Sequence, residues 1–412
     1  MPNLWKKLPP TDIKSRVFQA LTQNANYAHQ NILGVPASYL DDKVFNQDAS
    51  FVKDAPFIST LAQNPNHIGC HTRGTSEPFF AGTQALEREL IEICAVDILG
   101  AEENTIDGYV ASGGTEANLQ AVWIYRNLFR REHGAKTEEI ALLCTTDAHY
   151  CVDKAADVFS LDLFKVPVRE ATRRAEPASV TTTVTDLRRA GKKYVIAFAN
   201  MMTTMFGSVD AANDFADALA EAGLEYRIHV DGAFGGFYHP FTSQSPELSF
   251  ANPYISSVTL DAHKMAQAPY GTGIFLVRKG LIEYAGTPAD YVAGDDFTLI
   301  GSRSGANAVA VWMILATNGP YGWREKIYVL QQRTNWLCER LTELGLDFYR
   351  NPEANIVTIR ARHVPAEVAR RYHLVPDNHR KPAWYKVVVM EHVIIEKLLP
   401  LLRDLGAAAG AE

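Results

Sequence analysis

Short apolar runs alternate with amphipathic stretches through the middle of the chain. Three runs have the length and apolar character of buried strands: residues 140–144, 194–198 and 226–230. The stretches between and around them repeat apolar positions with helical spacing: 115–131, 149–159 and 210–222. This alternation predicts an α/β protein with a mostly parallel sheet and helices on both of its faces.

Both ends of the chain depart from this rhythm. Residues 1–65 hold several Pro, Asn and Asp and one short periodic helix near 13–22, so we expect an arm that packs on another surface, such as a partner subunit. Helical spacing dominates 307–344, and a strand–helix–strand–helix tail follows it. The expected organisation is an arm over 1–65, a large domain over 66–320 and a small α+β domain over 321–412.

The composition excludes several classes of protein. Hydrophobic residues make up 47% and charged residues 21% of the 412, and the net charge of −7 argues against a nucleic-acid surface. No uncharged apolar run reaches the roughly 18 residues of a membrane span, and residues 1–7 lack the apolar core of a signal peptide. The five cysteines show no CxxC spacing, which predicts free thiols in a reducing cytoplasm and no metal site.

Lys264 stands between two apolar strands. The run 258–265, Val-Thr-Leu-Asp-Ala-His-Lys-Met, ends in a His-Lys pair, and a glycine-punctuated turn leads to a second apolar run at 274–277. A lysine at the end of a buried strand loses hydration, which favours the neutral, nucleophilic amine. Such an amine can form a Schiff base, most commonly with pyridoxal 5′-phosphate (PLP). Taken alone, the residue also fits a surface charge at a strand end.

Two further segments supply groups that a PLP site needs. Residues 111–118, Ala-Ser-Gly-Gly-Thr-Glu-Ala-Asn, place small residues before a helix, where backbone N–H groups and the hydroxyl of Thr115 can hold a phosphate. Asp231 ends a buried strand in the run His-Val-Asp-Gly-Ala, and a carboxylate there is costly unless it is paired. A pyridinium N–H would pair with it and keep the ring an electron sink. Each segment alone also fits an ordinary capped turn.

His149 follows the predicted strand 140–144, at the sheet edge where α/β proteins bind ligands. Its imidazole could stack on a flat ring, and Thr203 and Thr204 could donate hydroxyl groups in the same crevice. A loop histidine and capping threonines are the structural alternatives. All these segments follow strand ends that meet on one edge of a parallel sheet, so their combination favours a PLP site.

The order of the segments resembles the fold-type I PLP enzymes, and within them the group II amino-acid decarboxylases, most closely the archaeal-type L-tyrosine/L-aspartate decarboxylases. The resemblance runs from about Phe80 to the end and includes Gly-Ser-Arg-Ser-Gly at 301–305. It implies an aspartate-aminotransferase-like large domain with a mostly parallel seven-stranded sheet, a small C-terminal α+β domain, and a homodimer with the active site between subunits. The implied reaction converts an aromatic or an acidic L-amino acid to its amine and carbon dioxide.

The resemblance also assigns roles to single residues. Lys264 would carry PLP and be catalytic, and His149 or Tyr291 would return a proton to Cα. The implied cofactor contacts are Gly114, Thr115 and His263 at the phosphate, Asp231 at the pyridine nitrogen, His149 over the ring, and Thr203 and Ala233 beside it. Polar candidates for binding the substrate are His67, His71 and Arg303, each of which also fits a structural role.

Two departures from the family pattern fall near this site. Met201-Met202 stands where many relatives have a Gly before the Thr pair, and Phe234 replaces a commoner Tyr or Trp. The alternatives to a decarboxylase are other PLP proteins: a sphingosine-phosphate-lyase-like enzyme, an aminotransferase that uses Arg360, a non-catalytic binder, or a cysteine-desulfurase-like lyase. The last would need a cysteine on an exposed loop, whereas Cys338 falls inside a predicted helix.

Overall fold

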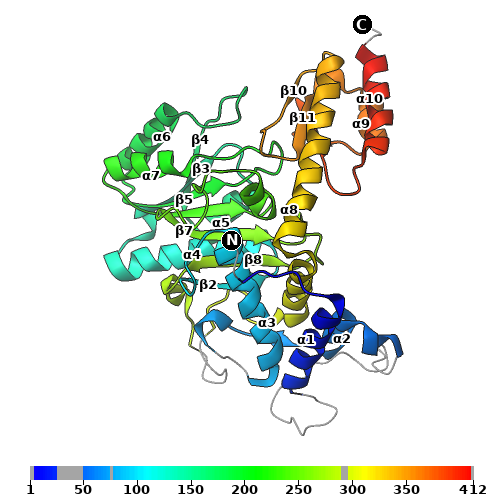
Figure 1. Cartoon of the computed structure of the whole chain (residues 1–412). Helices are drawn as coiled ribbons and strands as arrows, with labels where there is room; N and C mark the ends of the chain where they lie inside the picture. Colours follow the sequence, from blue (N-terminus) through cyan, green and yellow to red (C-terminus); the bar gives the residue numbers. More distant parts are fainter. Residues whose placement is uncertain (1–3, 26–49, 75–77, 289–295, 410–412) are drawn as a thin grey trace.

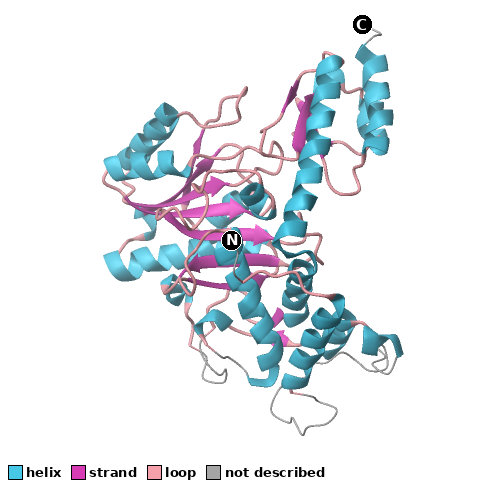
Figure 2. Cartoon of the chain, viewed as in Figure 1, coloured by secondary structure: helices cyan, strands magenta, loops and turns pink. Residues whose placement is uncertain are grey.

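A seven-stranded sheet lies at the centre of the molecule (Figures 1 and 2). The computed structural model describes residues 4–25, 50–74, 78–288 and 296–409. The strand order is β2-β8-β7-β6-β5-β3-β4, and β8 is antiparallel to both of its neighbours while the other pairs are parallel. The strands are β2 (Ile106–Ala111), β3 (Ile140–Thr145), β4 (Asp162–Val166), β5 (Tyr194–Asn200), β6 (Glu225–Gly232), β7 (Ile255–Asp261) and β8 (Gly273–Arg278).

The central strands are buried on both faces, which explains their continuous apolar sequences. Along β3, alternate residues enter two different hydrophobic cores: Ala141 and Leu143 join one, and Ile140 and Leu142 join the other. The first core includes residues of α3 (Ala81–Glu92), α6 (Pro177–Arg189), α7 (Ala212–Glu221) and α8 (Gly305–Glu343). The second includes residues of α4 (Gly114–His133) and α5 (Cys151–Phe159). The predicted α/β class and the mostly parallel sheet are therefore confirmed.

Helices cover the sheet and extend beyond it (Figure 2). α3 continues into a π-helical stretch over Ile93–Ile98. No helix in the described ranges is both long and apolar enough to cross a lipid bilayer. The α-helices are α1 (Pro10–Gln23), α2 (Pro56–Gln63), α3 (Ala81–Glu92), α4 (Gly114–His133), α5 (Cys151–Phe159), α6 (Pro177–Arg189), α7 (Ala212–Glu221), α8 (Gly305–Glu343), α9 (Ala366–Arg371) and α10 (Ile395–Ala409).

A small antiparallel sheet stands apart from the central one, at the upper right of Figure 1. Its order is β10-β11-β13-β12, with α9, α10 and the end of α8 packed on it. The long α8 joins the two sheets and bends at Gly319, which has φ 63° and is followed by Pro320. Its strands are β10 (Phe348–Tyr349), β11 (Ile356–Arg360), β12 (Val375–Pro376) and β13 (Trp384–Val388). The expected C-terminal α+β unit is present, whereas the division at residues 65 and 320 stays a prediction.

The amino-terminal segment packs on the chain's own helices. The indole Nε1 of the buried Trp5 donates to the Leu315 carbonyl at 2.6 Å. A Cβ on Gly319 would come within 2.5 Å of the Lys7 Cβ, so the bend in α8 and this segment fit closely. An arm was expected here, and within residues 4–25 it contacts α8 of the same chain; residues 26–49 of that arm lie outside the described ranges.

Candidate functional site

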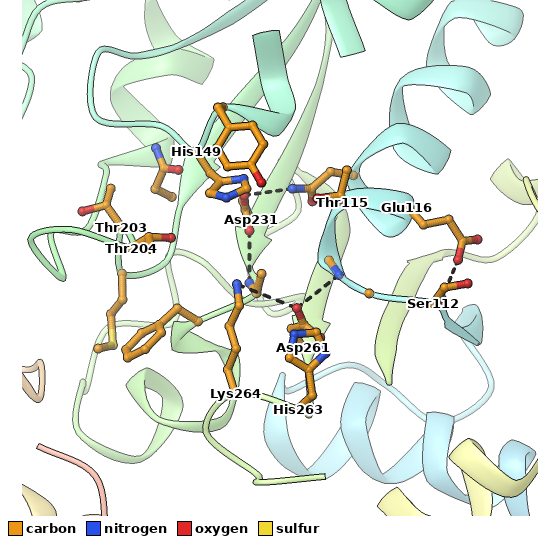
Figure 3. A pocket seen from close by; sticks show the side chains of 18 residues that line it. Ser112, Thr115, Glu116, His149, Thr203, Thr204, Asp231, Asp261, His263 and Lys264 are labelled. Carbon is orange, nitrogen blue, oxygen red and sulfur yellow. Dashed lines mark hydrogen bonds and ion pairs between the residues drawn. The ribbon is translucent and has the colours of Figure 1, made fainter. Parts of the chain in front are cut away.

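A cavity of about 320 Å³ opens at the carboxyl ends of the central strands (Figure 3). It is reached by the turns that follow β2, β3, β5, β6 and β7, the edge at which α/β proteins bind ligands. The structure brings the following predicted residues together in its lining: Gly114, Thr115, His149, Thr203, Thr204, Asp231, Ala233, His263 and Lys264.

The turn between β2 and α4 forms one wall. Gly113 has φ 148°, a conformation that side chains disfavour, and α4 begins at the next residue. A Cβ on Gly114 would lie only 2.9 Å from the Ala233 Cβ, so the backbone comes close to the end of β6 here. The backbone N–H of Gly114 donates to Asp261 Oδ2 at 3.2 Å. Small residues at a helix N-terminus leave room for an anion, so binding of a phosphate here stays a prediction.

Lys264 lies beside a carboxylate that sequence reasoning did not select. Its Nζ is 3.7 Å from Asp261 Oδ2, and His263 Nδ1 is 2.8 Å from Asp261 Oδ1. Burial raises the pKa of Asp261, and the positive charge of Lys264 opposes that rise. The Lys264 side chain is 28% exposed, so the amine reaches both the carboxylate and the open cavity (Figure 3). The signal for Asp261 was its place three residues before the lysine.

Asp231 points its carboxylate into the same space (Figure 3). Its Oδ1 accepts the Ala233 backbone N–H at 3.1 Å, and its Oδ2 accepts Asn118 Nδ2 at 2.9 Å. The residue is 8% exposed, so the carboxylate is held by these donors with little water. A buried acceptor at the cavity wall suits a ring N–H of a bound cofactor.

His149 and Thr203 approach the cavity from two other turns. Nδ1 of His149 accepts the Cys151 backbone N–H at 3.2 Å, which places the proton of a neutral imidazole on Nε2. Burial lowers the pKa of His149, and the charge of Asp231 opposes this shift. The hydroxyl of Thr203 lies 2.8 Å from Ser208 Oγ and also accepts the Ser208 N–H at 3.2 Å. Thr203 therefore holds its own turn while lining the cavity.

Two apolar residues of the lining were noted in the sequence only as departures from a family pattern. Met202 and Phe234 both line the cavity. Met202 has φ 68°, a left-handed conformation that costs about 1–3 kcal/mol for a residue other than glycine. Because strained residues cluster at functional sites, Met202 becomes a candidate for a functional role.

His67, His71 and Arg303, predicted to bind substrate, do not line the described cavity wall. They surround the buried Glu87: His67 Nδ1 is 2.5 Å and His71 Nε2 3.2 Å from Oε2, and Arg303 Nη1 is 2.6 Å from Oε1. Burial alone would raise the pKa of Glu87, yet Arg303 and the two histidines hold it well below its usual range. Burial lowers the pKa of His71 to about 4.

This Glu87 cluster has the composition of a metal site, because two imidazoles and a carboxylate lie within ligand distance of one another. The guanidinium of Arg303 already neutralises Glu87, however, and it also donates to the carbonyls of Val110 and Gly69. A positive side chain in contact with the carboxylate opposes a second cation. The arrangement is that of a structural ion pair, the alternative that the sequence left open for Arg303.

Other predicted residues lie away from the cavity or outside the described ranges. Tyr291 belongs to residues 289–295, which the structure does not describe. Cys338 lies inside α8, packed against the small-sheet core, and not on an exposed loop. Arg360 pairs with Glu170 at 2.6 Å and lies 3.8 Å over the ring of Trp384. Neither residue supplies what a desulfurase or an aminotransferase would need.

Comparison with known proteins identifies the family. Residues 84–359 match the model of the pyridoxal-dependent decarboxylase conserved domain. The chain belongs to this family. All the lining residues described above lie inside the matched range, so the cavity is part of the family's common domain.

Relatives of several specificities match the chain over most of its length. A tryptophan decarboxylase of Clostridium sporogenes is 47% identical over 97% of both chains. A probable L-tyrosine/L-aspartate decarboxylase of Methanothrix thermoacetophila is 28% identical over 86% of this chain and 91% of its own. L-methionine decarboxylase from a Streptomyces species has the same fold, with a TM-score of 0.73 at 19% identity over 96% of this chain and 93% of its own.

The chain is therefore a PLP-dependent amino-acid decarboxylase with the fold-type I architecture. The expected closeness to the archaeal-type enzymes was too specific, because the Clostridium enzyme is considerably more similar. The cavity fits the cofactor by its own chemistry: a cup of small residues before α4, a buried carboxylate acceptor and a lysine amine meet in one space.

Proposed function

We propose that the enzyme decarboxylates an aromatic L-amino acid, with L-tryptophan as the first candidate, to give the corresponding amine and carbon dioxide. The observation that carries this proposal is the 47% identity to tryptophan decarboxylase over 97% of both chains. The cavity supports it, because Lys264 is the only lysine or arginine among the described lining residues. An acidic substrate side chain would find no second lysine or arginine in this lining; Lys386 lies behind it, where its Nζ already donates to the Thr204 carbonyl at 2.8 Å.

Apolar lining residues favour an aromatic side chain over a polar one. Met202 and Phe234 provide a thioether and an aromatic ring at the cavity wall, and both kinds of group pack well on a flat aromatic system. Tyr150, 59% exposed, also lines the cavity, with its ring 4.1 Å from that of His149. We therefore assign the substrate side chain to the part of the cavity lined by Met202 and Phe234.

The proposed roles of the polar residues follow from their positions. Lys264 would hold the cofactor through Nζ, the backbone of Gly114 with Thr115 and His263 would bind its phosphate, and Asp231 would accept the pyridine N–H. Once bound, PLP supplies an electron sink for the pair of electrons left when the Cα–carboxylate bond breaks. The protein fixes the orientation of that bond and keeps water away from the reacting atoms.

His149 has two proposed tasks. Its ring would pack on the flat face of the cofactor. Because Nδ1 accepts the Cys151 N–H, the proton of the neutral ring is on Nε2, and His149 would donate this proton to Cα. Tyr291 is the other proposed donor. A Tyr291→Phe enzyme that keeps the normal rate and forms no extra carbonyl product would assign the proton to His149.

We also propose a homodimer with the active site between subunits. Tyr270 lies beside the cavity with its ring 4.9 Å from that of His263, and it is 87% exposed in the single chain. An aromatic side chain so exposed next to a site is suited to an interface. Light scattering of the purified protein should give twice the mass of 45.6 kDa. An active monomer would refute this part of the proposal.

The test of the function is a panel of amino acids scored for carbon dioxide and for the amine product. Tryptophan or tyrosine should exceed aspartate and glutamate in kcat/KM by about 100-fold or more, since an unpaired carboxylate in the cavity costs about 3 kcal/mol. Lys264→Ala is the inactive control. Aspartate turnover at an equal rate would refute the aromatic assignment, and no carbon dioxide from any amino acid would refute decarboxylation itself.

A further inference from the structure

The carboxylate of Asp231 is one end of a buried chain of hydrogen bonds that runs away from the cavity. Asn118 Nδ2 is 2.9 Å from Asp231 Oδ2, and Asn118 Oδ1 is 2.9 Å from His229 Nε2. His229 Nδ1 is 2.7 Å from Ser257 Oγ, which in turn lies 2.5 Å from the Tyr125 hydroxyl. None of these five residues is more than 8% exposed, so water does not replace these bonds.

The fold sets this chain of groups in place through three elements. His229 and Asp231 lie two positions apart on β6 and so face the same side of the sheet, and His229 is in register with Ser257 on β7. Asn118 and Tyr125 lie seven residues, or two turns, apart on α4, which covers that face. The four hydrogen bonds therefore join the two ends of one helical face to two neighbouring strands.

The direction of every bond follows from the first. An ionised Asp231 can only accept, so Asn118 must turn its Nδ2 toward the carboxylate and its Oδ1 toward His229. His229 must then donate from Nε2 and, being neutral, accept at Nδ1 from the Ser257 hydroxyl. Ser257 accepts from Tyr125 in turn. With all four hydrogen bonds donated in the same direction, from the Tyr125 phenol toward the Asp231 carboxylate, every group has a partner.

The residues around His229 and Tyr125 preserve this direction of the hydrogen bonds. His229 lies between the rings of Phe198 and Phe275, with centroids 5.0 Å and 6.3 Å away, and burial lowers its pKa to about 4. Burial also raises the pKa of Tyr125, so the phenol keeps its proton. The other titratable groups that act on Asp231 are His149 and Cys151 at the start of α5 and Lys264 and Asp261 at the end of β7.

We infer that Asn118 and His229 are positioning residues that hold Asp231 ionised and aimed at the pyridine nitrogen of PLP, with Ser257 and Tyr125 fixing the tautomer of His229. The inference rests on the role proposed for Asp231. Asn118 donates a stronger hydrogen bond to a charged carboxylate than to a neutral carboxyl group, and a proton on Oδ2 would leave this donor facing another donor. The chain of bonds thus favours the charged carboxylate, and a charged carboxylate favours a protonated ring.

The experiment measures PLP itself and needs no substrate: its dissociation constant, and the pH midpoint of the visible band of the bound cofactor. His229→Leu and Asn118→Leu should weaken PLP binding about tenfold or more and move the midpoint by about one unit, the effect of losing one hydrogen bond to a charged group. Thr259→Val is the matched control, because Thr259 Oγ1 also contacts His229 Nε2, at 3.2 Å, yet lies outside the chain to Asp231.

A second pair of variants keeps the inference testable where a leucine variant does not fold. His229→Gln retains a donor near the Nε2 position and should keep the midpoint near that of the parent, whereas His229→Asn, whose amide is one bond shorter, should shift it. Equal midpoints for these two, or an unchanged midpoint and affinity in folded Asn118→Leu, would overturn the inference. Asp231→Asn gives the reference: if it too leaves the midpoint unchanged, the role proposed for Asp231 is what fails.

Discussion

The guanidinium of Arg173 donates two hydrogen bonds to the carboxylate of Asp147, from Nε to Oδ2 at 2.9 Å and from Nη2 to Oδ1 at 2.5 Å. Asp147 lies two residues before His149, so this pair ties the turn that carries the imidazole to the hairpin closed by the Val168–Ala175 bridge. The same guanidinium lies 3.7 Å over the ring of Phe206. The position of His149 therefore depends on a residue outside the cavity.

Arg173→Ala should lower the free energy of unfolding by about 2–3 kcal/mol, since it leaves the Asp147 carboxylate buried without a partner. It should also weaken PLP binding, because the turn that carries His149 is no longer held. Denaturant unfolding and PLP titration give the two values. Arg169→Ala, in the same hairpin and part of an exposed pair with Glu176, should change stability by less than about 1 kcal/mol. Equal effects of the two variants would contradict the prediction.

Arg303→Met should cost about 3–5 kcal/mol of unfolding free energy, because Glu87 would remain charged and buried beside two histidines. The KM for the amino-acid substrate should stay unchanged in whatever fraction folds, since Arg303 does not line the described cavity. Unfolding curves and steady-state kinetics test the two statements. A raised KM with normal stability would instead restore Arg303 as a substrate ligand. Arg189→Ala, which breaks an exposed pair with Asp186, is the control.

Acid should destabilise the protein through its buried histidines. Burial lowers the pKa of His229 to about 4. Between pH 6.5 and about 4, His229 is therefore protonated in the unfolded state but not in the folded state, so the free energy of unfolding falls as the pH falls. The full effect is about 3 kcal/mol. Burial raises the pKa of Asp210 to about 6, which acts in the opposite direction, so a difference between two proteins is the useful quantity.

That difference is between the parent and His229→Gln, measured by denaturant unfolding from pH 7 to pH 5. The stability advantage of the parent should shrink by about 1.4 kcal/mol for each unit below pH 6.5. Asp210 is present in both proteins and cancels. Parallel stability curves for the two proteins would show that the imidazole is protonated in the folded state.

Met202→Gly and Met202→Ala separate backbone strain from side-chain packing. Both remove the thioether from the cavity wall, but only glycine accepts the φ of 68° without cost, so the glycine variant should be the more stable by about 1 kcal/mol. Both should raise the KM for an aromatic substrate. If the alanine variant is equally stable, the backbone relaxes at this position and the strain argument fails.

Local patterns in the sequence were sufficient for most of the fold and for most of the predicted residues that meet in the cavity. Strands such as β5 and β7 are continuous apolar runs, and each cavity segment is a short motif at a strand end. β4 was missed because it is a short edge strand in which the exposed Asp162 and Lys165 interrupt the apolar residues, so it has no continuous apolar run. α6 was not predicted although its buried Val180, Val184 and Leu187 have helical spacing, because its run of Thr and Val residues has low helix propensity.

Partners distant in sequence account for the rest. Arg303 looked like a substrate ligand because its own partner, Glu87, is 216 residues away, and a charge without a visible partner suggests function. Asn118 and His229 are 111 residues apart, and no local sequence pattern around either residue predicts their contact. Asp261 stood inside a recognised motif, but its contact with the backbone of Gly114 depends on how β2 and β7 are arranged in the sheet.

The packing of Trp5 against Leu315 has a consequence for the way the chain is made. The two residues are 310 positions apart, so during synthesis the indole N–H cannot bind the Leu315 carbonyl until residue 315 has left the ribosome. Through that interval α1 can pack on α3, but the contacts of α1 with α8 and of Trp5 with Leu315 and Trp323 are still missing. Closing so long a loop is slow, and this segment should be where nascent chains meet chaperones and where refolding from denaturant lags.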